Sequence, residues 1–141
     1  MNFDRISPVV LSALRVVAGL LFLEHGLKKI LSFPPSPAPA GAVIHAAHAA
    51  LPPIMMAAGY IEIVGGILIA LGLFGRFAAF ICSGEMAFAY FMAHSPDSFF
   101  PVNNGGDAAI LFCFVFLYVA FAGPGAWSLD ALLRPKRDSA R

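Results

Sequence analysis

Three ionisable residues lie inside stretches of the chain that are otherwise apolar: Arg15, Glu62 and Glu85. A charged side chain at the centre of a bilayer costs a few kcal/mol or more, so such residues pair with one another or line a polar cavity. A buried carboxylate can accept a hydrogen bond or exchange a proton, and an arginine can bind a carboxylate through two parallel hydrogen bonds. These three residues are therefore the first candidates for a ligand-binding or proton-carrying site.

The composition of the chain is that of a membrane protein. Hydrophobic residues make up 60% of the 141 residues and charged residues 12%, whereas a soluble domain has about 25% charged residues. The formal net charge of +1 gives no electrostatic reason to bind nucleic acid. The length fits a single domain over residues 1–141, with the lipid bilayer as its main environment.

Four apolar segments are long enough, or nearly long enough, to cross a bilayer. The expected helices cover residues 8–27, 53–74, 77–93 and 108–122. A spanning helix needs about 20 residues, so the fourth helix must borrow length from its flanks or lie where the bilayer is thinner. The sequence therefore predicts an all-α membrane protein, a bundle of four transmembrane helices with a proline-rich outer loop at 32–53.

The distribution of basic residues predicts how the bundle is oriented, because Lys and Arg are enriched in cytoplasmic loops. The outer side of the predicted path carries Lys28 and Lys29. The other side carries a larger set of basic residues, namely Arg5, Arg76, Arg134, Lys136, Arg137 and Arg141. We therefore expect both termini to be cytoplasmic, and the loops at 32–53 and 94–107 to lie outside.

Counting along the predicted helices places the three buried charges at similar depth. At about 1.5 Å per residue, each lies roughly 13–15 Å from the outer end of its helix. We expect Arg15 to bind one carboxylate through a forked hydrogen bond, and the second carboxylate to stay neutral or share a proton. Such a layer is either a structural ion pair that fixes the helix register, or a ligand or proton site.

Glycines share a helix face with these charges on two of the predicted helices. The first face carries Arg15, Gly19, Phe22, Gly26 and Lys29, and the second carries Glu62, Gly65, Gly66, Ile69, Gly72 and Arg76. Small residues let helix backbones approach closely in lipid. Both faces are therefore expected to pack against other helices, and a homo-oligomer is compatible with them.

Other residue types limit the cofactors that this chain can hold by itself. His25 and His94 at the outer helix ends could ligate a metal or protonate a quinone headgroup, or make ordinary interfacial hydrogen bonds. Cys82 and Cys113 stand alone, so no CysXXCys redox pair is present. The sequence also contains no haem pair, glycine-rich loop for a flavin or other dinucleotide, or metal motif, so redox chemistry would need a quinone or a partner subunit.

Several motifs distributed along nearly the whole chain are specific when taken in order. They are Arg15, Gly19, FLEHGLKK at 22–29, EIVGGILIALG at 62–72, Arg76, Met86, Ala89, His94, Gly105 with Gly106, GPG at 123–125 and SLD at 128–130. In this order and spacing they resemble the DoxX family of small four-helix bacterial membrane proteins. The family takes its name from a subunit associated with a quinol oxidase and thiosulfate:quinone oxidoreductase.

The resemblance implies a multi-pass protein of the bacterial inner membrane that acts as an accessory subunit of a redox complex, with redox partner proteins. The expected ligand-binding residues, for a quinone-like or other small lipophilic ligand, are Arg15, Glu62, Glu85, His25 and His94. No self-contained catalytic motif is visible, so any enzymatic role would be as part of an oxidoreductase complex. A small proton-coupled transporter or channel, and a purely structural scaffold subunit, are the alternative functions.

Overall fold

A computed structural model describes residues 3–35 and 51–133 of the chain, and within these ranges all of the regular structure is helical. Most of the predicted proline-rich loop at 32–53 lies outside the described residues. In chain order the helical elements are α1 (Phe3–Leu31), α2 (Pro53–Leu71), α3 (Gly75–Ala89), the π-helix η1 (Tyr90–His94), α4 (Pro101–Asn104), α5 (Asp107–Ala122) and α6 (Leu129–Leu133).

Three of the described helices are long and apolar enough to cross a membrane. They are Ile6–Leu31, Pro53–Leu71 and Gly75–His94, with 26, 19 and 20 residues. The fourth apolar helix, α5, has 16 residues and is therefore about 24 Å long, which is less than the roughly 30 Å hydrocarbon core. The predicted all-helical class, with three long apolar helices and one shorter one, is thus confirmed.

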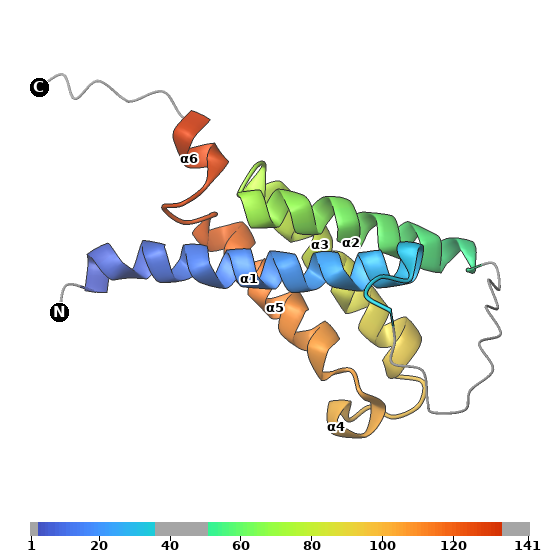
Figure 1. Cartoon of the computed structure of the whole chain (residues 1–141). Coiled ribbons are helices and arrows are strands. Elements are labelled where there is room, and N and C mark those ends of the chain that lie inside the picture. The colour runs from blue at the N-terminus through green and yellow to red at the C-terminus, as the bar shows by residue number, and fades with distance from the viewer. Residues whose placement is uncertain (1–2, 36–50, 134–141) are drawn as a thin grey trace, which may run out of the picture.

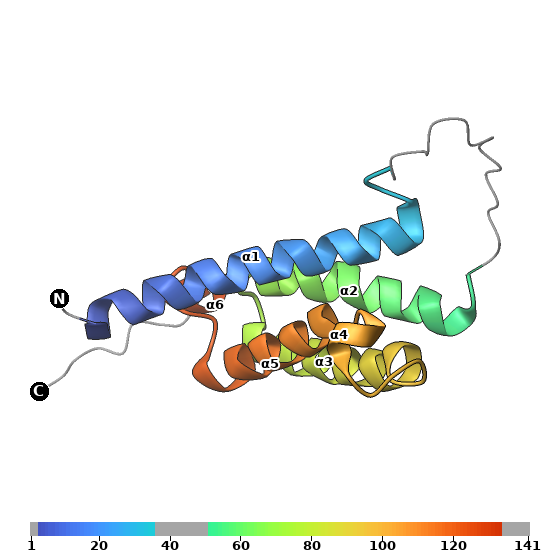
Figure 2. The same cartoon turned by 90° about the horizontal axis from the view of Figure 1, so that it is seen from below.

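The helices are arranged as two layers. Helix α1 lies along α2 and α3 lies along α5, and the two pairs meet mainly where α2 contacts α3 (Figures 1 and 2). The start of α1, the ends of α2 and α5, and α6 gather at one end, here called the Arg15 end; α4 lies at the opposite end, here called the α4 end.

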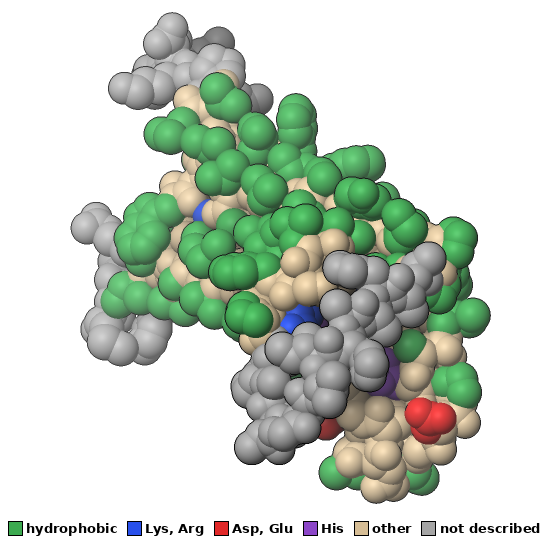
Figure 3. Space-filling view, turned by 45° about the vertical axis from the view of Figure 1, so that its right-hand side comes forward, with side chains coloured by type: hydrophobic (Ala, Val, Ile, Leu, Met, Phe, Trp, Pro, Cys, Tyr) green, Lys and Arg blue, Asp and Glu red, His purple; other side chains and the backbone are tan. Residues whose placement is uncertain are grey.

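Hydrophobic side chains cover much of the face of the bundle that Figure 3 shows. Large apolar side chains such as Phe77, Phe114 and Phe121 are more than 60% exposed, with values of 71%, 64% and 73%. A soluble monomer rarely exposes apolar area on this scale. The surface therefore suits the hydrocarbon of a bilayer.

The helix boundaries differ from the predicted ones for local reasons. Helix α1 extends beyond the predicted residues 8–27 at both ends, and its last turn holds two lysines, whose charge suits the partly negative helix C-terminus. Helix α2 ends before the predicted Phe74, because Gly72 adopts the left-handed conformation with φ of 67°. The N–H of Gly72 donates to the carbonyl of Ile69 at 3.0 Å, which closes the last turn.

Glycines bring α1 and α2 into direct backbone contact. A Cβ atom added to Gly19 would lie 2.7 Å from the backbone nitrogen of Ala70, and one added to Gly26 would lie 2.7 Å from the carbonyl oxygen of Gly59. A Cβ atom on Gly66 would lie 2.7 Å from a backbone nitrogen of α1. The predicted close approach of these glycine faces is confirmed.

Replacing Gly66 with alanine is expected to lower the free energy of unfolding by about 1–3 kcal/mol, because the new methyl group overlaps the α1 backbone. Gly84→Ala is the matched control, since a Cβ atom on Gly84 meets no heavy atom within 4 Å. Unfolding of the purified full chain in detergent measures both variants. Equal stability of the two variants would contradict the close α1–α2 contact.

Candidate functional site

Arg15 is fully buried, but its guanidinium group binds backbone carbonyls rather than a carboxylate. Its Nη1 atom donates to the carbonyl oxygens of Ile69 and of Ala70, the latter at 2.7 Å, and its Nη2 atom donates to the carbonyl oxygen of Trp127. The last carbonyls of a helix lack partners within the helix and carry partial negative charge, and arginine has five N–H donors to satisfy them. The predicted fork from Arg15 to a carboxylate is therefore wrong.

Two more charged side chains bind helix termini at the Arg15 end. Nη1 of Arg76 donates to the carbonyl oxygens of Ala120 and Phe121 at 3.0 and 2.6 Å, near the end of α5. The carboxylate of Asp130 accepts the backbone N–H groups of Phe74 and Gly75 at 2.9 and 2.8 Å, at the start of α3. Charged side chains at this end thus hold helix ends together.

The cation that pairs with Glu62 is Lys29. The Nζ atom of Lys29 donates to Oε1 of Glu62 in a salt bridge between α1 and α2. The Glu62 side chain is 2% exposed and that of Lys29 is 26% exposed. The Oε2 atom of Glu62 is buried and has no hydrogen-bond partner. Glu62 lies about 10 Å along α2 from Ile69, whose carbonyl Arg15 binds. Arg15 and Glu62 are therefore at different depths, and the predicted single layer is also wrong.

Glu85 lies on the facing helix, α3, close to this ion pair. A Cβ atom added to Gly65 would clash with Sγ of Cys82, and Glu62 and Glu85 are each one turn from that contact, toward the α4 end. Both Glu62 and Lys29 are near enough to Glu85 for charge–charge interaction. The Oε2 atom of Glu85 is buried without a hydrogen-bond partner. We call these three side chains the Lys29–Glu62–Glu85 cluster.

The two predicted histidines make local hydrogen bonds. Nδ1 of His25 lies 2.8 Å from the carbonyl oxygen of Leu21, one turn earlier in α1, and its ring packs edge-on against Phe112 with 5.6 Å between centroids. Nδ1 of His94, the last residue of η1, lies 3.0 Å from the carbonyl oxygen of Asn104. Among the described residues, no group of three or more His, Cys, Asp or Glu side chains is placed to hold a metal ion.

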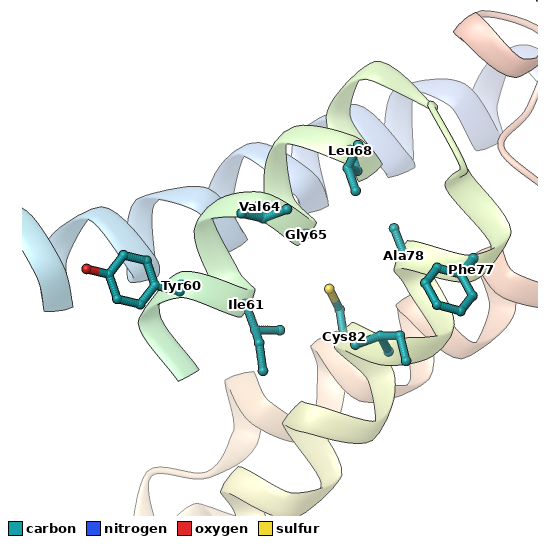
Figure 4. Close-up of a pocket in the computed structure, with 9 residues that line it drawn as sticks. Tyr60, Ile61, Val64, Gly65, Leu68, Phe77, Ala78 and Cys82 are labelled. Atoms are coloured by element: carbon teal, nitrogen blue, oxygen red, sulfur yellow. The ribbon is translucent and has the colours of Figure 1, made fainter. Parts of the chain in front are cut away.

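An apolar groove of about 350 Å³ opens between α2 and α3 (Figure 4). The sulfur atom of Cys82 points into the space between the two helices. Gly65 and Cys82 both line the groove and are each one turn from a glutamate of the cluster. The other lining residues include Tyr60, Val64, Phe77 and Ile81. The volume lies within the range of small-molecule sites, which are mostly apolar with a few polar groups.

The sequence prediction missed Lys29 as a member of the site, although the signal was present. Lys29 lies on the same helix face as Gly19 and Gly26, and this face and the face of Glu62 were each expected to pack against another helix. Pairing the two glycine faces in antiparallel order would have placed Lys29 opposite Glu62. The groove could not be predicted, because it depends on the angle between α2 and α3.

Apolar helices, close glycine contacts and a buried interhelical ion pair together define a multi-pass helical membrane protein. The model of the DoxX family matches residues 10–95, and the chain belongs to the DoxX family. An uncharacterized protein of Haemophilus influenzae is 44% identical over 132 residues, which cover 92% of this chain and 94% of that protein. No solved structure matches the chain. The whole Lys29–Glu62–Glu85 cluster falls within the matched residues.

Double-mutant cycles are expected to show that Glu62 is coupled to Lys29 and not to Arg15. Lys29→Met and Glu62→Gln should be coupled by about 0.5–3 kcal/mol in the free energy of unfolding, because each removes the same ion pair. Arg15→Met and Glu62→Gln should be additive within about 0.5 kcal/mol, because their partners differ. Unfolding in detergent measures both cycles, and a coupling of Arg15 with Glu62 as large as that of Lys29 would contradict the observed pairing.

Proposed function

We propose that this DoxX-family membrane protein is an accessory subunit of a membrane redox complex that binds a quinone-like or other small lipophilic ligand at the Lys29–Glu62–Glu85 cluster. The observation that carries this proposal is that two buried, unpartnered carboxyl oxygens belong to residues one helical turn from Gly65 and Cys82, which line an apolar groove. A quinone combines an apolar ring and tail with two oxygens that form hydrogen bonds. The groove and the cluster offer a surface for each part.

The chemistry of the cluster suits a headgroup that both donates and accepts hydrogen bonds. A carboxylate oxygen of Glu62 or Glu85 accepts a bond from a quinol hydroxyl, and a protonated carboxyl group donates to a quinone carbonyl. A buried polar atom without a partner costs about 1–3 kcal/mol. A headgroup that forms hydrogen bonds with both Oε2 atoms therefore gains affinity by removing this cost.

In this proposal partner proteins transfer the electrons, because the sequence contains no CysXXCys pair, haem pair or metal motif. With both termini in the cytoplasm of a bacterium, as the basic residues predict, the cluster lies in the outer half of the inner membrane. Its ligand would enter from the lipid, because the groove is on the surface of the bundle between α2 and α3.

A proton-coupled transporter or channel is the alternative function, and it is favoured by the presence of two carboxyl groups beside one lysine. Conduction would need a polar path to the Arg15 end. The core in that direction is apolar, and four of its side chains are fully buried: Phe22, Ile69, Phe116 and Val119. Ligand binding is therefore the better-supported function for the structure described here.

Adding a short-tailed benzoquinone, or its quinol, to the purified full chain in detergent is expected to raise the melting temperature. At a ligand concentration 100-fold above Kd the stabilisation would be about 2.7 kcal/mol. Glu62→Gln and Glu85→Gln should abolish the shift, whereas Glu24→Gln, on the exposed surface of α1, should retain it. The absence of a shift with both ligands, or an unchanged shift in both cluster variants, would overturn the proposal.

Proteoliposomes distinguish the transporter from the binding subunit. Vesicles containing the wild-type chain are expected to hold an imposed pH gradient as long as protein-free vesicles do, because fully buried apolar side chains such as Phe22 and Phe116 fill the described core. The decay of the gradient is followed with a pH-sensitive dye inside the vesicles. A faster decay that Glu85→Gln removes would favour transport instead.

A further inference from the structure

The Lys29–Glu62–Glu85 cluster contains one more carboxyl group than cations. Glu62 is the one charged residue of α2, so that helix supplies no second cation. Helix α3 adds Arg76, which binds the end of α5 at the Arg15 end, and α5 has Asp107 as its one charged residue. Within residues 3–35 and 51–133, Lys29 of α1 is the cation that pairs with Glu62 and lies within charge–charge range of Glu85, whereas the neighbouring Lys28 binds the carbonyl of Pro34.

Other titratable groups nearby do not change this count. Cys82 of α3 lies within charge–charge range of Glu62 and Glu85, but a neutral thiol brings no positive charge. His25 of α1 is exposed and hydrogen-bonded to the carbonyl of Leu21 in its own helix. With both glutamates ionised, the cluster would carry a net negative charge inside the bilayer, where solvating an unbalanced ion costs several kcal/mol.

The unpartnered carboxyl oxygens indicate where a proton would bind to balance the charge. The Oε2 atom of Glu62 and the Oε2 atom of Glu85 are both buried and lack a hydrogen-bond partner, and the Glu62 side chain is 2% exposed. A carboxylate oxygen only accepts hydrogen bonds, so two ionised carboxylates cannot satisfy each other. One proton turns one of them into a donor.

We propose that the cluster is a proton-binding site, in which Glu62 of α2 and Glu85 of α3 share one proton and Lys29 balances the remaining negative charge. The shared proton forms an O–H···O⁻ hydrogen bond between the two helices, and bonds of this kind are short and strong. The occupied site is neutral. The same bond links the α1–α2 pair to the α3–α5 pair beside the groove.

This inference concerns the same residues as the proposed function and deepens it, because the carboxyl lone pairs that the shared O–H···O⁻ bond leaves free can accept a hydrogen bond from a headgroup hydroxyl. It rests on the charge count and not on the identity of the ligand. The two ideas can therefore fail separately, and the proton site is tested on protein without added quinone.

Infrared spectroscopy of the full chain in lipid vesicles tests the proposal, since the C=O stretch of a protonated carboxylic acid is separate from the bands of carboxylates. At neutral pH the wild-type chain is expected to show one band from a buried protonated carboxyl group. Glu62→Gln and Glu85→Gln should each remove it, because Lys29 then balances the single remaining carboxylate. Lys29→Met should about double the band, because both carboxyl groups then lack a cation and protonate.

Glu24→Gln is the matched control and should leave the band unchanged, because Glu24 is exposed. Circular dichroism of each variant shows whether it is folded. If a glutamine variant does not fold, the infrared spectrum of Lys29→Met tests the proton site instead. Absence of the band in the wild-type chain, its survival in both glutamine variants, or its loss in Lys29→Met would overturn the proton site. A chain with the band that binds no quinone would overturn the proposed function alone.

Discussion

Lipid offers no hydrogen-bonding partner, so a polar group inside the bilayer has to find one within the protein. This constraint governs how the helices of the chain meet. Arg15 binds carbonyl groups in the last turn of α2, and Lys29 of α1 binds Glu62 further from that end. The glycine contacts between α1 and α2 bring the backbones close enough for both interactions. Together they fix the register of the two helices.

The two polar regions differ in how many buried side-chain atoms lack a hydrogen-bond partner: one at the Arg15 end, the Nε atom of Arg15, and two in the Lys29–Glu62–Glu85 cluster. At the Arg15 end, Arg15, Arg76 and Asp130 bind the backbone of helix termini, which accounts structurally for the first arginine, the second arginine and the SLD motif. In the Lys29–Glu62–Glu85 cluster, by contrast, two carboxyl oxygens are buried without a partner. Native proteins keep few such groups, and those they keep call for an explanation in terms of a ligand, a proton or a catalytic role. The first region is therefore explained by structure, and the second is the functional candidate.

The sequence was sufficient to predict the apolar helices and the buried glycine faces, because both follow from composition and from a period of 3.6 residues. It was not sufficient to place the charges at their true levels. Counting depth from helix ends assumes that neighbouring helices begin at the same level, yet Gly26, near the predicted end of the first helix, packs against Gly59, which is already six residues (53 to 59) into α2. Arg15 consequently reaches the end of α2, and Lys29 pairs with Glu62 in the position that was expected for Arg15. The groove depends on how α2 and α3 diverge, which no periodicity encodes.

Photoaffinity labelling tests most directly whether a ligand reaches the cluster through the groove. A benzoquinone with a photoreactive group on its tail is added to the full chain in lipid vesicles, irradiated, and the adducts are located by mass spectrometry. Our account predicts adducts concentrated on the groove residues of α2 and α3, such as Val64 and Ile81, and lost in Glu62→Gln. Adducts spread evenly over the lipid-facing surface, including exposed Phe114 and Phe121 of α5, or unchanged in Glu62→Gln, would contradict it.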